Sequence, residues 1–167
     1  MAIPTDDFLN QAIDEVVAVL EASPDFMSDE ASSPPADASG VIKCVEDYFP
    51  SWEDIPANQL PHCSVGYLGD EPNLIDSAAS GEDYTINLGI RLYHRGTDRR
   101  QIWRDLLKAG AAVAKILSYE MSPEGANFNG FVTNAQYLGG EPIDTHEPSA
   151  FGGCLTVRVA LQISRPD

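Results

Sequence analysis

The sequence predicts an α+β fold, in which a mostly antiparallel sheet packs against two helices within a single domain. Two segments carry apolar residues at helical spacing, and two others alternate apolar and polar residues as half-buried strands do. The order along the chain is one helix, three strands, a second helix and two strands, a sequence of elements typical of helices layered on a sheet. With 167 residues, 43% of them hydrophobic, the chain suffices for one such domain spanning residues 1–167.

The first helix is predicted over residues 6–22. Thr5 can cap it, and the acids Asp6 and Asp7 suit the positive end of the helix dipole. Its apolar stripe consists of Phe8, Ala12, Ile13, Val16, Val17 and Leu20. The following segment, 23–40, is rich in serine and proline and has no large apolar residue after Met27. It predicts a long acidic loop, a flexible insertion in the domain.

Two short strands are predicted before the middle of the chain, at 41–49 and 63–68. The stretch between them, 50–62, has three prolines and is not expected to form a long regular element. After the second strand, residues 69–83 form an acidic connection rich in residues that break strands and helices.

The second half has the clearest periodicity. Strands are predicted at 84–93 and 154–164, where apolar residues occupy every second position. Between them, Thr97 is the expected cap of a helix over 98–118, and a further strand over 129–138 is expected to turn at Gly139-Gly140. The apolar stripe of this second helix consists of Ile102, Leu106, Ala109, Gly110, Val113, Ile116 and Leu117.

The charge is strongly negative and unevenly distributed. Twenty-six acidic and ten basic residues give a formal net charge of −16. Residues 1–82 contain seventeen acids and one base, Lys43, whereas residues 83–167 contain nine of each. Binding to phosphates or to anionic lipids requires clustered basic residues. The composition therefore argues against a protein that binds nucleic acid through its phosphates and against a membrane-surface protein.

Targeting and redox features favour a protein made in a cytoplasm. No apolar run approaches the roughly 20 residues of a spanning helix, and the acidic N-terminus lacks the basic and apolar regions of a signal peptide.

Three widely spaced cysteines fit neither a disulfide framework nor a zinc knuckle, so we expect buried free thiols. They are Cys44, Cys63 and Cys154.

No catalytic or cofactor motif is present: the sequence has no GxGxxG, no P-loop, no HExxH and no GxSxG. It therefore predicts no enzyme, no cofactor and no metal site. One alternative stays open, a small metal-dependent enzyme with a site assembled from His62, His146 and Cys154. Paired acids offer oxygen ligands but lack the spacing of a calcium loop, so we expect them to be solvated. These pairs are Glu53-Asp54, Asp70-Glu71 and Glu82-Asp83.

A basic segment contrasts with the acidic total. From Arg91 to Lys108 there are six bases and two acids, and Arg100, Arg104 and Lys108 share one helix face, roughly opposite the apolar stripe. One interpretation is a solvated face on which Asp105 and Lys108 support each other. The other is a contact with the acidic surface of a second subunit, since separated patches of opposite sign allow head-to-tail association into rings. The interface candidates are Arg91, Arg95, Arg99, Arg100, Trp103, Arg104 and Lys108.

Several stretches, taken in order, match the layout of a known family. They are the helix at 6–22, PHCSVGY at 61–67, YTINLGIRLYHRG at 84–96 with the helix from Arg99 to Leu117, VTNAQYLGG at 132–140, and the closing strand at 155–163. In this pattern the chain resembles the tail terminator (tail completion) family of long-tailed bacteriophages. The resemblance covers most of the chain but includes no signature motif, and the 23–40 insertion departs from it.

The resemblance implies an α+β subunit that forms a hexameric ring on the finished tail tube. Such a ring stops tube polymerisation, joins the tail to the head connector or head-closure protein, and lets DNA pass without sequence-specific binding. Its location would be the tail or neck of the virion, assembled in the host cytoplasm, with no membrane or cofactor involved. An acidic lumen would repel phosphates and let DNA slide. The alternative within the same class is another neck or head-closure ring protein of a phage.

Overall fold

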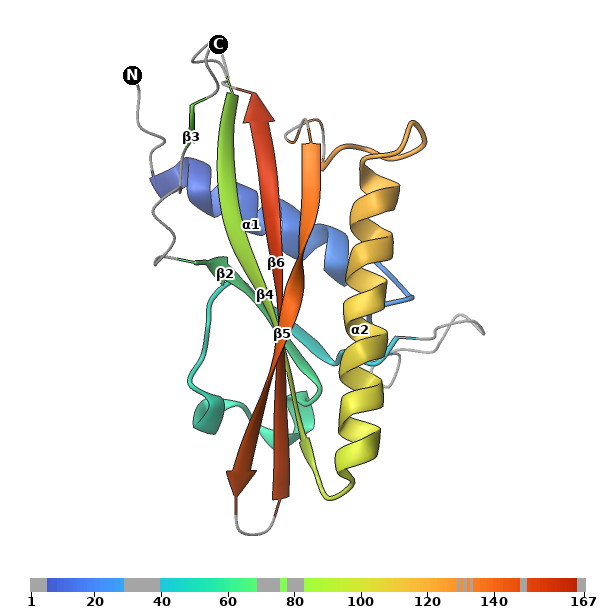
Figure 1. Cartoon of the computed structure of the whole chain (residues 1–167). Helices are drawn as coiled ribbons and strands as arrows, with labels where there is room; N and C mark the ends of the chain where they lie inside the picture. The colour runs from blue at the N-terminus through green and yellow to red at the C-terminus, as the bar shows by residue number, and fades with distance from the viewer. Residues whose placement is uncertain are drawn as a thin grey trace.

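The computed structural model describes residues 6–28, 40–68, 76–77, 83–128, 130, 132, 134–147 and 150–164. In this part of the chain, six strands form one sheet and two α-helices accompany it (Figure 1). The strands are β1 (Cys44–Glu46), β2 (His62–Tyr67), β3 (Asp76–Ser77), β4 (Asp83–Gly96), β5 (Asn134–Glu147) and β6 (Ala150–Ser164).

The sheet is mostly antiparallel, which confirms the predicted α+β class. The strand order is β1-β2-β4-β6-β5, and β3 pairs with β4 off this path. Only β1 and β2 run parallel among the described pairs of strands. The strands predicted at 84–93 and 154–164 correspond to β4 and β6, which lie side by side along their full length. They form the centre of the sheet, on which the other elements are built.

The helices α1 (Asp6–Glu21) and α2 (Arg99–Glu120) form where the apolar stripes predicted them. α1 crosses the strands, and α2 runs alongside them (Figure 1). Both helices and alternate residues of β2, β4 and β6 contribute to one core cluster, with Leu106 of α2 and Val157 of β6 completely buried. In the described residues, no helix is long and apolar enough to cross a membrane.

The cap of α2 lies one residue after the predicted position. Asp98, rather than Thr97, is the N-cap, because its carboxylate accepts hydrogen bonds from the backbone N–H groups of Arg100 (3.0 Å) and Gln101 (3.2 Å). An aspartate at this position also places a negative charge at the positive end of the helix dipole.

The sheet face away from the helices is covered in part by the segment between β1 and β2. This segment contains only two short 3-10 helices, Trp52–Asp54 and Ala57–Gln59. The prediction that its prolines prevent a long regular element is therefore confirmed. A second, smaller apolar cluster forms beneath it. This cluster consists of Ile55, Leu60, Tyr93 and Cys154.

Phe49 leads from β1 onto this second face and packs on two facing glycines. Gly66 of β2 is the cross-strand partner of Gly89 of β4. A Cβ atom on Gly66 would lie 2.8 Å from Cζ of Phe49, and one on Gly89 would lie 3.2 Å from the same atom. The guanidinium of Arg91 covers the ring, 4.0 Å from its centroid, as a cation–π contact. The absence of side chains at the two glycines therefore makes room for the ring.

The predicted loop at 23–40 begins with turns, as expected, but residues 23–28 pack into the fold. Phe26 is completely buried, and its carbonyl accepts hydrogen bonds from the backbone N–H groups of Val41 and Ile42. Met27 forms an isolated parallel bridge with Ile42. The apolar pair Phe26-Met27 thus holds this end of the segment in the core. Residues 29–39 lie outside the described residues, as does most of 69–83.

Two strand predictions also need correction. The strand expected at 41–49 is only β1, because the chain turns away after Glu46 and carries Phe49 onto the second face. The strand expected at 129–138 is β5, and Gly139-Gly140 does not turn it. β5 pairs with β6 on both sides of these glycines, with an irregularity between Tyr137 and Gly139. Glycines inside a strand are typical of such a bulge.

Candidate functional site

The outer side of α2 carries the basic residues that the sequence places on one face. Arg100, Arg104 and Lys108 are all exposed, and Leu107 lies among them with 61% of its surface exposed. We call these four residues the basic face of α2. Trp103 is half-buried at its border, where it packs against the core. An exposed leucine flanked by three cations is a surface that can bind an acidic, partly apolar partner.

The remaining interface candidates do not all belong to this face. Arg91 and Arg95 lie on β4, where Arg91 alternates with the core residue Leu92 and stacks on Phe49. Its side chain is therefore on the sheet face opposite the helices. Arg99 is exposed at the start of α2. The structure thus divides the six bases into a strand group and a helix group.

Asp105 connects α2 to β4. Its Oδ1 accepts a hydrogen bond from Nε2 of Gln101 at 2.8 Å, and its Oδ2 lies 3.2 Å from Nε2 of His94. Burial lowers the pKa of His94, and the charge of Asp105 opposes this shift. The imidazole is then neutral near pH 7 and donates its Nε2 proton to Asp105. Asp105 therefore links Gln101 of α2 to His94 of β4.

An acidic groove lies between α1 and β1. Four acids line it together with apolar atoms of both elements. α1 contacts β1 and β2 and also touches α2, whereas α2 contacts β4, β5 and β6. The acidic groove and the basic face of α2 are therefore formed by different elements. The acids are Asp14, Glu21, Glu46 and Asp47.

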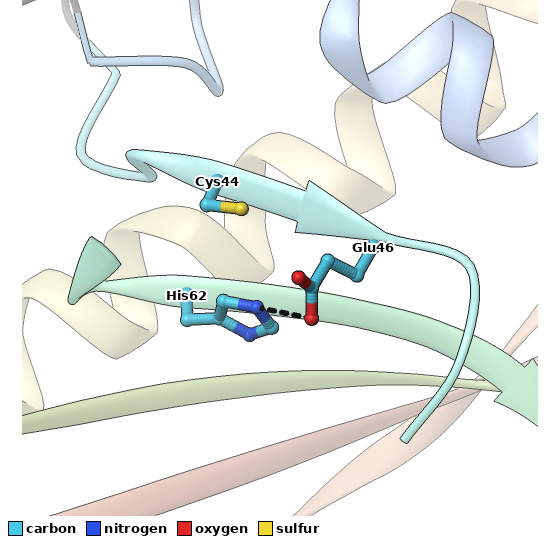
Figure 2. A group of neighbouring side chains, drawn as sticks. All are labelled: Cys44, Glu46 and His62. Carbon is cyan, nitrogen blue, oxygen red and sulfur yellow. Dashed lines mark hydrogen bonds and ion pairs between the residues drawn. The ribbon is translucent and has the colours of Figure 1, made fainter. Parts of the chain in front are cut away.

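A second group of side chains gathers where β1 pairs with β2 (Figure 2). Cys44 is the parallel partner of His62, and Glu46 lies two residues along β1, on the same side of the strand. Nε2 of His62 lies 3.0 Å from Oε2 of Glu46, and Nδ1 lies 3.2 Å from Oγ of Ser64. The potential ligand atoms of Cys44, Glu46 and His62 all lie within 4.8 Å of one another.

Burial determines the protonation of this group. It lowers the pKa of His62 against the opposing charge of Glu46. Burial also raises the pKa of the Cys44 thiol, and the charges of Glu46 and Glu21 add to that shift. The imidazole and the thiol are therefore neutral near pH 7. In this state Nε2–H of His62 donates to Glu46, and Nδ1 accepts from the Ser64 hydroxyl.

The chain of hydrogen bonds from Ser64 through His62 to Glu46 has the composition of a hydrolase triad. Ser64 and His62, however, are both completely buried. A nucleophile must reach the reacting carbon of its substrate, and this hydroxyl is closed off from solvent. The arrangement therefore orients the imidazole and offers no accessible nucleophile.

The metal-ligand set considered from the sequence does not assemble as one group. Tyr93 pairs with His62 on one side and with Cys154 on the other, so His62 and Cys154 are two strand spacings apart, about 9.6 Å. The backbone of His146 pairs with Phe151, three residues from Cys154. In the part of the chain that the structure describes, the possible ligand atoms that gather around His62 are those of Cys44 and Glu46, and Cys154 is not one of them.

The expectation for the cysteines is confirmed for two of the three. Cys63 and Cys154 are buried free thiols, whereas Cys44 is half-exposed. Burial raises the pKa of all three thiols. Of the acidic pairs, Glu53-Asp54 lies in the first 3-10 helix with Glu53 and Asp54 exposed, as expected. Asp70-Glu71 and Glu82 lie outside the described residues.

Cys44 and Glu46 were not predicted as site residues. A signal for them exists, because Cys-Val-Glu in a strand places the first and third side chains on one face. What the sequence does not reveal is the parallel pairing that brings His62 beside Cys44.

Comparison with known proteins adds no relative: no family model matches the chain, and no curated protein is significantly similar to it.

Proposed function

We propose that this protein is a structural component of a bacteriophage virion, a ring-forming tail terminator. The ring, a hexamer by its resemblance to that family, caps the tail tube, stops its polymerisation and joins the tail to the head connector. The α+β fold, with a long helix between the central strands, agrees with the resemblance and supports this proposal.

The observation that carries the proposal is the separation of the basic face of α2 from the acidic groove between α1 and β1. Three exposed cations and an exposed leucine lie on one part of the molecule, and four acids line a groove on another. Two different, complementary surfaces on one chain form a heterologous contact, which closes into a ring when the rotation between neighbours allows it. Electrostatic complementarity fixes the register and the partner in such contacts.

The edge strand β5 supports association as well. It is 14 residues long and ends the sheet at the side covered by α2. Among the described residues, no strand pairs with its outer side. A long edge presents unpaired backbone groups to which a neighbouring chain can add hydrogen bonds. Pairing of β5 with a neighbouring subunit would provide partners for these backbone groups.

The net charge of −16 suits a ring through which DNA passes. An acidic surface repels the phosphate backbone, whereas clustered cations would retain it. In this proposal, the cations of α2 face neighbouring subunits and the acids that remain exposed face the DNA. The protein makes and breaks no bond and needs no cofactor for this role.

Charge reversal on α2 tests the ring contact. R100E/R104E is expected to stay folded but to give smaller particles than the wild type in light scattering coupled to size-exclusion chromatography. R100K/R104K keeps both charges and is expected to keep the ring. N10D/Q11E adds two negative charges at exposed positions of α1, half the change made by R100E/R104E, and tests whether added negative charge away from α2 disturbs the assembly. Unchanged particle size in R100E/R104E would refute the α2 contact.

A tube-capping assay separates the terminator from a head-closure protein. When the protein is added to tail-tube subunits from the same phage, electron micrographs are expected to show short tubes with extra density at one end. Tubes that grow to the same length with and without the protein would contradict the terminator and favour another neck protein.

A further inference from the structure

We propose that Cys44, Glu46 and His62 form a binding site for one divalent transition-metal ion of the zinc class. The three side chains come from two neighbouring strands and meet at the edge of the sheet (Figure 2). The site lies within one chain, so the inference does not depend on ring formation.

The geometry is close to that of a zinc site. With bonds of about 2.0–2.3 Å, ligand atoms around a tetrahedral ion lie about 3.3–3.8 Å apart. Here Nε2 of His62 and Oε2 of Glu46 are 3.0 Å apart, and the three ligand atoms lie at most 4.8 Å from one another. Rotamer adjustment of Cys44 and Glu46, which are both partly exposed, closes the difference. The backbone positions already match, because Cys44 pairs directly with His62.

The donor set selects the class of ion. A thiolate and an imidazole favour zinc and related transition ions, whereas magnesium and calcium require oxygen ligands. Three protein ligands leave the fourth position of a tetrahedral ion to water. The partial exposure of Cys44 and Glu46 gives that position access to solvent.

Ser64 supplies the outer contact that metal-bound histidines usually make. Binding through Nε2 requires the imidazole proton to be on Nδ1, where Oγ of Ser64, 3.2 Å away, accepts it. The proton that Nε2 donates to Glu46 in the metal-free protein is therefore replaced by the ion, and the imidazole stays neutral. The Cys44 thiol releases one proton to solvent and coordinates as a thiolate. Glu46 contributes a carboxylate oxygen.

The surroundings favour a cation. Glu21 and Asp47 line the acidic groove beside Glu46, and the charge of Glu21 acts on Cys44. Among the described acids and bases, this part of the molecule is negative, which raises the local concentration of cations. Binding would also cross-link β1, a strand of only three residues, to β2. The ion would thus act as a clamp on the edge of the sheet.

Calorimetric titration of the full-length, metal-stripped protein with Zn²⁺ tests the proposal. One ion per chain is expected, and Cys44→Ser and Glu46→Gln are each expected to weaken binding about tenfold or more. Matched controls are Cys154→Ser, which removes a thiol outside the group, and Glu53→Gln, which removes an exposed acid that lines neither the ligand group nor the acidic groove. Both controls are expected to retain wild-type affinity.

Substitution by Co²⁺ supplies a second readout. A thiolate-to-cobalt charge-transfer band is expected in the wild type and in Cys154→Ser, and its loss is expected in Cys44→Ser. Circular dichroism of each variant verifies that the fold is intact. Absence of zinc binding by the wild type, or equal binding by Cys44→Ser and the wild type, would overturn the proposal. Displacement of zinc by excess Mg²⁺ would overturn the assigned class of ion.

Discussion

Replacing Gly66 with alanine is expected to destabilise the protein because of the Phe49 ring. Gly66 lies within β2, and its backbone conformation is one that alanine adopts without strain. The new Cβ would lie 2.8, 2.9 and 3.0 Å from three atoms of the ring. Ordinary carbon contacts are about 3.5 Å or more, so the ring has to move by about 0.7 Å. The Arg91 guanidinium lies over the same ring, 4.0 Å from its centroid, and this contact opposes the movement.

The size of the change in the free energy of unfolding follows from two opposing effects. Overpacking of this kind costs about 1–3 kcal/mol, and the lower conformational entropy of alanine in the unfolded chain returns about 0.4–1 kcal/mol. We expect a net loss of about 1–2 kcal/mol in the free energy of unfolding. For a chain of this length that corresponds to a fall of about 3–6 °C in Tm.

A double-mutant cycle isolates the ring as the cause. In an F49A background, the methyl group of Gly66→Ala meets no ring, and the substitution is expected to be neutral or slightly stabilising. Urea unfolding followed by circular dichroism gives all four free energies, and the coupling between the two positions is expected to be about 1–2 kcal/mol. Equal costs of G66A with and without Phe49 would refute this account of the second face.

Three further predictions follow from burial. Leu106→Ala removes a completely buried side chain of α2 and is expected to cost about 3 kcal/mol in urea unfolding, whereas a cost below about 1 kcal/mol would contradict its place in the core. Burial lowers the pKa values of His62 and His94 in the folded state. Once the pH falls below about 6.5, the pKa of a histidine in the unfolded chain, these two histidines therefore bind more protons in the unfolded state than in the folded state. Their contribution to stability is therefore present above that pH and is lost as the pH falls, so the wild type should lose more stability than His94→Gln between about pH 7.5 and pH 5.5. Of the three thiols, Cys44 alone is expected to react with a thiol reagent in the native protein, and equal reactivity of all three would contradict their burial.

The fold class could be predicted because its main elements carry strong periodic patterns. β4, α2 and β6 each bury one face, and alternate residues or a helical stripe record this directly in the sequence. The predicted elements differ from the observed ones where a single side-chain contact determines the path of the backbone. Phe26 brings residues 23–28 into the core, and Phe49 ends β1 early by packing on Gly66.

The basic face of α2 could also be predicted, since residues four apart share a helix face. The separation of Arg91 from that face could not, because it depends on which side of β4 faces the helices and on the position of Phe49. The group of Cys44, Glu46 and His62 depends on the pairing of two strands, and strand pairing is a long-range property that local patterns do not determine.

The most direct test of the central claim is the mass of the native assembly. Native mass spectrometry is expected to show six chains of 18.1 kDa in one particle, about 109 kDa, that separates into monomers as salt is raised. A hexamer that is lost in R100E/R104E and kept in R100K/R104K is the result that the proposed ring predicts. A protein that stays monomeric at low salt and high concentration would contradict the ring and the function built on it.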